Sequence, residues 1–106
     1  MPLPSEYVAK GWCQGADARD KAGGAVDTID IRAACWCPSG AINAAYHAKY
    51  ETVSRLEDAL AAKVGEQWVA WNDAPERTQG EVVALLQAVE KELGLTQELK
   101  ESAHDS

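Results

Sequence analysis

The clearest helical periodicity in the chain lies near its C-terminal end. From residue 78 onward apolar residues recur at three- and four-residue steps, which places them on one face of a helix. Thr78 and Glu81 precede this stripe at the spacing of a capping box, and Gly94 follows it as a stop. We therefore expect a helix between Thr78 and Gly94 that buries Val82, Leu85, Leu86, Val89 and Leu93.

Two more stretches carry helix signals. Ser54 and Glu57 form a second capping box beside an apolar stripe, and Gly65 ends the helix that they predict. A short helix is expected over residues 4–10, because this stretch starts with a proline and a serine and is followed by a glycine.

The middle of the chain combines a helical stripe with a proline. Because proline removes a helix hydrogen bond and clashes with the preceding turn, we expect a kink or break at Pro38, with Pro38 in the first turn of a second segment. The small residues of that segment allow close approach of other backbones, which suits a central helix. The stripe comprises Ile31, Ala34, Cys35, Pro38, Ala41, Ile42 and Ala45.

The remaining segments predict little regular structure. Two extended arms around residues 20–24 would form a loose hairpin, and the aromatic residues 66–71 are expected to be extended. The predicted fold is mainly α: three or four helices around an alanine-rich central helix, with a small irregular β-hairpin and one short extended segment. Residues 1–95 would form a single helical domain, and residues 96–106 a frayed C-terminal tail.

Composition places this chain among ordinary globular proteins. Its 106 residues are 46% hydrophobic and 25% charged, which suits one domain with a core of its own. No apolar run approaches the length of a membrane span and no signal-peptide core is present, so we expect a cytoplasmic protein without membrane contact. Three cysteines, Cys13, Cys35 and Cys37, are an odd number and indicate reduced thiols.

The charge is distributed unevenly between the two halves. Acids and bases balance at five each in residues 1–50, whereas residues 51–106 hold twelve acids and five bases and thus the whole net charge of −7. Direct nucleic-acid binding is not expected, because phosphates require a basic face. The acidic half can serve solubility alone, meet a basic protein partner, or imitate DNA.

No set of residues predicts a metal site or a catalytic centre. Cys35 and Cys37 would point to different faces of a helix, and Cys13 and His47 would have to complete a metal site. No catalytic or phosphate-binding motif occurs, and nothing local marks a reactive thiolate. We expect no cofactor, no metal and no catalytic residue, and a non-enzymatic protein rather than an enzyme.

The best site candidate is the corner before the last helix. Arg77 stands at the positive end of that helix, so we expect a carboxylate to hold it, from Asp73, Asp17 or Asp20. One interpretation is a structural brace between this corner and the glycine-rich loop. The other is a polar pocket for an anionic or amide-bearing ligand. Its residues would be Arg19, Asp20, Asn72, Asp73 and Arg77, with Trp12 and Trp71 as walls.

Trp36 is a separate candidate. On a helix it would be rotated about 100° from the neighbouring stripe, so it is expected to project outward. There it would anchor a protein partner or a second copy of the chain.

Three blocks of sequence carry a family resemblance. They read Gly-Trp-x-Gln-Gly…Ala-Arg-Asp, Trp-Cys-x-x-Gly-Ala-Leu, and aromatic-Asn-Asp-x-Pro-x-Arg-Thr…Glu-Val. The chain resembles a family of small bacterial and bacteriophage proteins of unknown function, departing from its pattern at Pro38 and at Ile42. The resemblance brings no activity, but it implies that the loop and the Asn-Asp corner form one assembly. The matching residues are Gly11, Trp12, Gln14, Gly15, Ala18, Arg19, Asp20, Trp36, Cys37, Gly40, Ala41, Trp71, Asn72, Asp73, Pro75, Arg77, Thr78, Glu81 and Val82.

These observations leave three functions open. The first is a non-enzymatic, acidic protein-interaction module, in the phage-related setting that the resemblance implies. The second is a small-ligand or enzymatic pocket at the Asn-Asp corner. The third is a DNA mimic that inhibits a nucleic-acid enzyme, which requires acids in residues 81–105 to form two rows at phosphate-like spacing.

Overall fold

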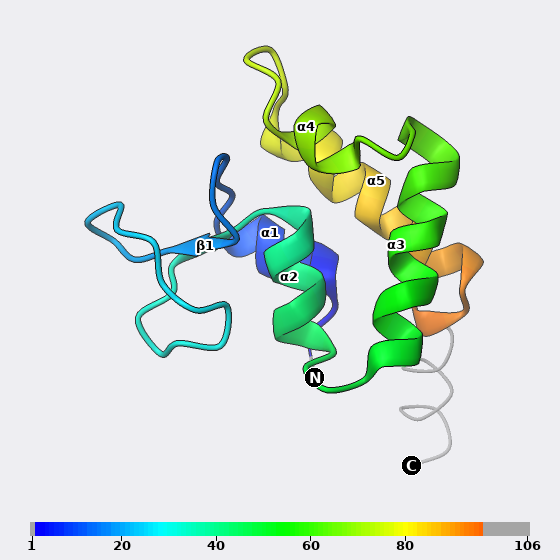
Figure 1. Ribbon diagram of the computed structural model, residues 1–106, viewed down its shortest axis with the longest axis horizontal. Helices are drawn as coiled ribbons and strands as arrows, with labels where there is room; N and C mark the ends of the chain where they lie inside the picture. The colour runs from blue at the N-terminus through cyan, green and yellow to red at the C-terminus, as the bar shows by residue number, and fades with distance from the viewer. Residues whose placement is uncertain (1, 97–106) are drawn as a thin grey trace.

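Helices supply most of the regular backbone in the computed structural model, which describes residues 2–96 (Figure 1). The small antiparallel sheet lies at the opposite end of the molecule from α3. This mainly helical fold confirms the predicted class, although the described residues form five helices instead of three or four. The elements are α1 (Pro4–Lys10), β1 (Ala18–Arg19), β2 (Cys35–Trp36), α2 (Pro38–Ala45), α3 (Tyr50–Val64), α4 (Trp68–Asn72) and α5 (Gln79–Glu92).

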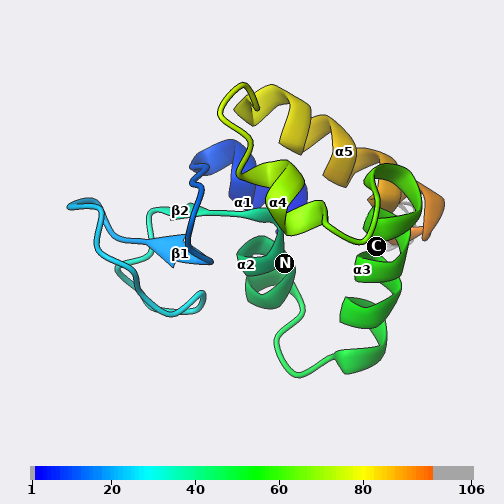
Figure 2. The same cartoon turned by 45° about the horizontal axis from the view of Figure 1, so that its top comes forward.

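The core lies where α1, α2, α3 and α5 meet. Helix α1 packs on both α2 and α5, and α5 also contacts α3 (Figure 2). Apolar side chains from all four helices are buried there, as the stripe in α5 predicts. Burial of this apolar surface supplies the main favourable term in folding. Its members include Val8, Ile42, Leu56, Leu60, Val82, Leu86 and Val89.

The central helix starts at the proline. Pro38 occupies the first turn of α2, and the Cys37 sulfur caps the helix by accepting from the Gly40 backbone N–H at 3.4 Å. Gly40 is needed for packing, because a Cβ there would lie 1.9 Å from the Asp17 carbonyl oxygen. The prediction of a second segment beginning at Pro38 is therefore confirmed.

The expected helix before the proline is wrong. Residues 28–34 form turns, and Ile31 is 99% exposed, not part of a buried stripe. Two aspartates account for this, because the Asp27 carboxylate accepts from Thr28 N and the Asp30 carboxylate accepts from Arg32 N. Such local bonds offer the backbone an alternative to a helix, and the residue before a proline disfavours helical geometry.

The glycine-rich loop forms a turn at the expected place but pairs with a different strand. Residues 20–24 close a turn and lead to an isolated antiparallel bridge between Arg19 and Ala25. The regular partner of β1 is the distant β2, antiparallel, with Arg19 opposite Cys35. The sequence identifies the turn but not this longer-range pairing.

Two boundaries differ from the prediction in the second half. Helix α3 begins at Tyr50, so Ser54 lies inside the helix and the expected capping box there is wrong. The segment expected to be extended is the short helix α4, because a helix turns Trp68 and Trp71 to the same side, where both pack on the core.

The C-terminal part agrees better with the prediction. The capping box of Thr78 and Glu81 is present at the start of α5. Beyond Thr96, the predicted tail lies outside the described residues. Among the helices that the structure does describe, none has the length and apolar character needed to cross a bilayer.

Candidate functional site

A buried asparagine organises the corner between α4 and α5. Asn72 is the last residue of α4 and is 1% exposed. Its Oδ1 accepts a 2.7 Å hydrogen bond from the indole Nε1 of Trp12. Its Nδ2 donates to the Cys13 carbonyl at 3.3 Å and to the Asp73 carboxylate at 3.0 Å. Both amide hydrogens are therefore used inside the protein.

The glycine-rich loop is tied to the same corner by two further residues. Gln14 Nε2 donates to the carbonyls of Asn72 and Ala74, at 2.8 and 2.9 Å. The Gly15 backbone N–H donates to the Asp73 carboxylate at 3.0 Å. The loop and the corner thus form one hydrogen-bonded unit through amide and indole groups.

The structure corrects the expected partner of Arg77. Its Nη1 lies 3.1 Å from Oε2 of Glu81, in the first turn of α5, and not against Asp73, Asp17 or Asp20. Its Nε donates to the Trp71 carbonyl at 2.9 Å, and the guanidinium carbon lies 3.9 Å from the centre of the Trp71 ring. Glu81 lies four residues after Arg77 in the first turn of α5, where the helix dipole favours an acid.

The other members of the predicted pocket bond elsewhere. Arg19 donates to the carbonyls of Gly23 and Gln14, at 2.9 and 3.4 Å. The Asp20 carboxylate accepts from two backbone N–H groups of its own turn. The structure therefore brings Trp12, Asn72 and Asp73 together. Arg19 and Asp20 instead brace the turn at residues 20–24, and Arg77 braces the start of α5.

A small hollow lies beside this corner. Its volume is about 160 Å³, below the range of about 300–1,000 Å³ typical of small-molecule sites. Two carboxylates and one thiol border it. The lining residues are Gly15, Ala16, Asp17, Cys37, Val69 and Asp73.

Trp36 does not project outward as predicted. Its side chain is buried, its Nε1 donates to the Thr28 carbonyl at 3.0 Å, and its ring packs edge-to-face on Tyr7 with centroids 5.0 Å apart. Trp36 belongs to a strand and not to a helix, so the expected rotation away from the stripe does not occur. A partner surface cannot use the exposed ring that the sequence predicts.

The buried thiols are poor candidates for nucleophiles. Burial raises the pKa of Cys13 to about 12 and that of Cys37 to about 11, so both stay protonated near neutral pH. His47 is exposed on the turn after α2. Within residues 2–96 no three histidine, cysteine or acidic side chains are grouped closely enough to hold a metal ion.

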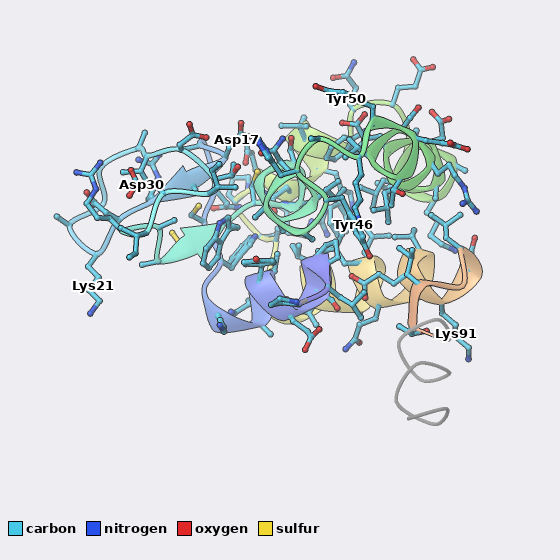
Figure 3. All side chains as sticks on the ribbon, turned by 90° about the horizontal axis from the view of Figure 1, so that it is seen from below. Asp17, Lys21, Asp30, Tyr46, Tyr50 and Lys91 are labelled. Carbon is cyan, nitrogen blue, oxygen red and sulfur yellow. The ribbon has the colours of Figure 1, made fainter. Side chains whose placement is uncertain are left out.

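A much larger cleft lies between the two loops at the sheet end. Its volume is about 720 Å³, and two of its walls are the turn at residues 20–22 and the segment 31–34. Figure 3 shows Lys21 and Asp30 at this end of the molecule, on the loops beside the sheet. The lining residues are Lys10, Asp20, Lys21, Ala22, Ile31, Arg32, Ala33, Ala34 and Trp36.

The cleft rim combines an exposed apolar side chain with two lysines that have no ion pair within residues 2–96. Ile31 is 99% exposed on the rim, and nearby Ile29 is 54% exposed. Arg32 is held by Asp30 at 2.8 Å, a pair that lowers the pKa of Asp30 to about 2. In the described part of the chain, neither Lys10 nor Lys21 takes part in an ion pair. Residues 29–32 alternate isoleucine with a charged residue. This alternation is the sequence signal for an extended, exposed segment, and the predicted helix did not take it into account.

In the described segment 81–96, the acidic side chains that DNA mimicry would require are buried or bonded to other residues of the protein. Glu81 is bonded to Arg77 and Thr78, and Glu92 pairs with Lys63. Glu90 is completely buried. These three side chains do not form two exposed rows, and the remaining acids of the segment lie outside the described residues.

Comparison with known proteins adds a family. The model of DUF6197, described as a family of unknown function, matches residues 6–92. The chain belongs to DUF6197. That match includes the Asn72 corner, the thiols and the cleft of this DUF6197 protein. No curated protein and no solved structure matches the chain.

Proposed function

We propose that this DUF6197 chain is a non-enzymatic protein-interaction module that contacts its partner through the 720 Å³ cleft. The observation that carries the proposal is Ile31, whose side chain stands 99% exposed on the rim. Isoleucine is normally buried, and exposed apolar groups bordering a concave surface commonly mark an interaction site. Ile29, 54% exposed on the same segment, extends this apolar character.

The bonding of the reactive groups supports a binding role over an enzymatic one. The amide of Asn72 is saturated by internal bonds, and Arg77 is paired with Glu81 and stacked on Trp71. Catalysis by an acid, base or nucleophile requires a group within reach of a substrate. These polar residues serve the fold, and the hollow beside them is small.

The charges of the cleft favour an acidic occupant. Lys10 and Lys21 are free of ion pairs in the described residues, whereas the negative charge of Asp20 is bound by backbone N–H groups. Ala33 and Ala34 give the cleft an apolar lining. We therefore assign the cleft to a peptide segment of a partner protein that carries an acidic residue next to a large apolar one.

The resemblance of the three sequence blocks to bacterial and bacteriophage proteins supports a phage-related setting for this partner. The acidic second half would then serve solubility. Proteins encoded by genes that lie next to the gene of this chain are candidate partners for a direct binding measurement.

A peptide-display selection tests the proposal. The full chain is immobilised and a random peptide library is selected on it. We expect enriched peptides to combine acidic and large apolar residues, and to bind the Ile31→Asp and Lys21→Glu variants at least tenfold more weakly. The matched control is Tyr50→Asp, because Tyr50 is 82% exposed on α3, away from Lys21 (Figure 3).

The control should leave peptide affinity unchanged. Enrichment of peptides without acidic residues would contradict the assigned occupant. Equal binding to wild type and Ile31→Asp would contradict the cleft as the site. Ile31→Asp should fold normally, since substitutions at exposed positions usually change stability by about 0.5 kcal/mol or less.

A further inference from the structure

The floor of the cleft is one short segment around β2. Ala34 and Trp36 both line the cleft, whereas Cys35 between them does not. This pattern fits extended backbone, in which every second side chain points to the same face. The Cys35 sulfur instead lies 3.8 Å from the Arg19 carbonyl oxygen. The cleft therefore rests on one large aromatic and one small apolar side chain.

The ring of Trp36 is held in place at this floor. Its indole Nε1 donates to the Thr28 carbonyl at 3.0 Å, and the ring packs edge-to-face on Tyr7. Trp36 is 8% exposed, so only a small part of it faces the cleft. Ala34 is half-buried and contributes only a methyl group beside it. A large apolar side chain of a ligand would bury apolar surface here without displacing the indole.

Strand β2 has a neighbour along each of its two edges. Trp36 pairs with Ala18 of β1 on one edge and with Trp12 on the other. Lys10 and Lys21 both line the cleft with exposed side chains, and each is joined in sequence to a different one of these neighbours. The two lysines therefore approach the Trp36 floor from opposite sides.

Backbone contacts hold both approaches in place. On the side of Lys10, Gly11 lies so close to the floor that a Cβ on it would stand 2.1 Å from the Ala34 carbonyl oxygen. On the side of Lys21, the Ala34 backbone N–H donates to the Arg19 carbonyl at 2.8 Å. Each lysine lies within two residues of its contact, so the backbone of each is held beside the floor.

The other charged residues of the cleft are engaged within the protein. The Asp20 carboxylate accepts from two backbone N–H groups, and Arg32 is paired with Asp30 at 2.8 Å. Within residues 2–96 no ion pair involves Lys10 or Lys21. These two lysines are therefore the charges that the cleft offers to an acidic ligand, one on each side of an apolar floor.

We propose that the peptide segment bound in the cleft carries one large apolar residue flanked by acidic residues on both sides. The apolar side chain lies on Trp36 and Ala34, and the two acids meet Lys10 and Lys21. This inference rests on the proposed function, because it assigns the recognition pattern of the same cleft. It adds that both flanks of the apolar residue are read and that Ala34 limits its size.

A series of synthetic peptides tests the pattern on the wild-type chain by isothermal titration calorimetry. The probe is a glycine peptide with a central leucine between two glutamates, either adjacent to the leucine or separated from it by one glycine. Its controls carry glutamine for either or both glutamates, or alanine for the leucine. We expect each lost acid to weaken binding by up to about fivefold, as for exposed ion pairs. Loss of the leucine should weaken it by on the order of tenfold or more.

Two lysine variants assign the acids. Lys10→Gln and Lys21→Gln are each titrated with the same peptides, which gives a double-mutant cycle for every lysine–glutamate pair. We expect each variant to become insensitive to one glutamate, and the two variants to differ in which glutamate that is. A variant that stays as sensitive to both glutamates as the wild type would overturn the assignment of its lysine.

Ala34→Leu tests the floor. The larger side chain would occupy the space beside Trp36, so we expect the affinity for the leucine peptide to fall by on the order of tenfold. Cys35→Ala is the matched control, because Cys35 is the adjacent residue and does not line the cleft. It should leave the affinity unchanged. If Ala34→Leu fails to fold, the peptide series on the wild-type chain still decides the question.

The outcomes separate this inference from the proposed function. If no peptide of the series and no displayed peptide binds the wild-type chain, the proposed function fails and this inference fails with it. If peptides with one glutamate bind as tightly as those with two, the flanked pattern is wrong while the cleft remains a peptide site. Unchanged affinity of the leucine peptide for a folded Ala34→Leu variant would likewise overturn the assigned floor alone.

Discussion

Replacement of Asn72 by alanine tests the hydrogen-bonded corner most severely. The substitution removes the acceptor of the Trp12 indole N–H and the donor to the Cys13 carbonyl, at a position that is 1% exposed. Leaving a buried donor or acceptor unsatisfied costs about 1–3 kcal/mol for each group. We therefore expect Asn72→Ala to lower the free energy of unfolding by about 2–5 kcal/mol. A typical domain has a total free energy of unfolding of about 5–15 kcal/mol, so this loss is large.

Urea unfolding followed by tryptophan fluorescence measures this loss, and a thermal melt gives the same quantity independently. The expected fall in melting temperature is about 8–40 °C, at roughly 4–8 °C per kcal/mol for a domain of this size. The Trp12 indole N–H resonance should also lose its protection from solvent exchange. Gln87→Ala, at an exposed position of α5, is the matched control and should change stability little.

A loss below about 1 kcal/mol for Asn72→Ala would refute the reasoning, because it would mean that water replaces these bonds at no cost. An unchanged Trp12 indole resonance would refute it separately. That result would show that the indole N–H does not bond to the Asn72 side chain.

Two further substitutions test other parts of the packing. Glu90 is completely buried and bonded by the N–H and hydroxyl of Ser5, and burial raises the pKa of its carboxyl above the ordinary 4.5. The folded protein therefore holds this proton more tightly than the unfolded chain does. The stabilisation of the fold by the protonated Glu90 carboxyl is complete below about pH 4.5 and is lost as the pH rises through the pKa of the folded protein. As the pH rises, Glu90→Gln should therefore become more stable relative to wild type, which urea unfolding at several pH values measures. A difference in the free energy of unfolding between variant and wild type that stays the same at every pH would contradict the raised pKa of the buried carboxyl. Gly40→Ala should lose at least about 2 kcal/mol, because its Cβ would lie 1.9 Å from the Asp17 carbonyl oxygen, and an unchanged urea midpoint would exclude that close approach.

Much of the helical architecture could be predicted because its signals are local. The capping box of Thr78 and Glu81, the break at Pro38 and the stop at Gly65 each depend on residues within one or two turns. The helix expected before Pro38 is absent, and other local signals account for that too. Its apolar spacing was correct, but Asp27 and Asp30 bind the nearby backbone and hold the segment in turns.

The candidate site was harder to predict because its bonds cross the chain. The sequence indicated that the Asn-Asp corner and the glycine-rich loop belong together, and the structure joins them. The partners differ from those expected. Asn72 bonds to Trp12 and Cys13, about sixty residues away, while Arg77 bonds to Glu81, four residues further along the chain. Periodicity carries no information on such long-range pairs. The cleft was missed because most of its lining residues lie in irregular loops.

The most direct test of the cleft as a partner surface is a titration followed by ¹H–¹⁵N NMR. A peptide from the display selection, carrying an acidic residue next to a large apolar one, is added to the full chain. We expect the largest shift changes at Lys21, Ile31, Arg32 and Ala34, and little change along α3. Shift changes that concentrate on α3 or on the Asn72 corner, with Ile31 unaffected, would contradict the assignment of the cleft.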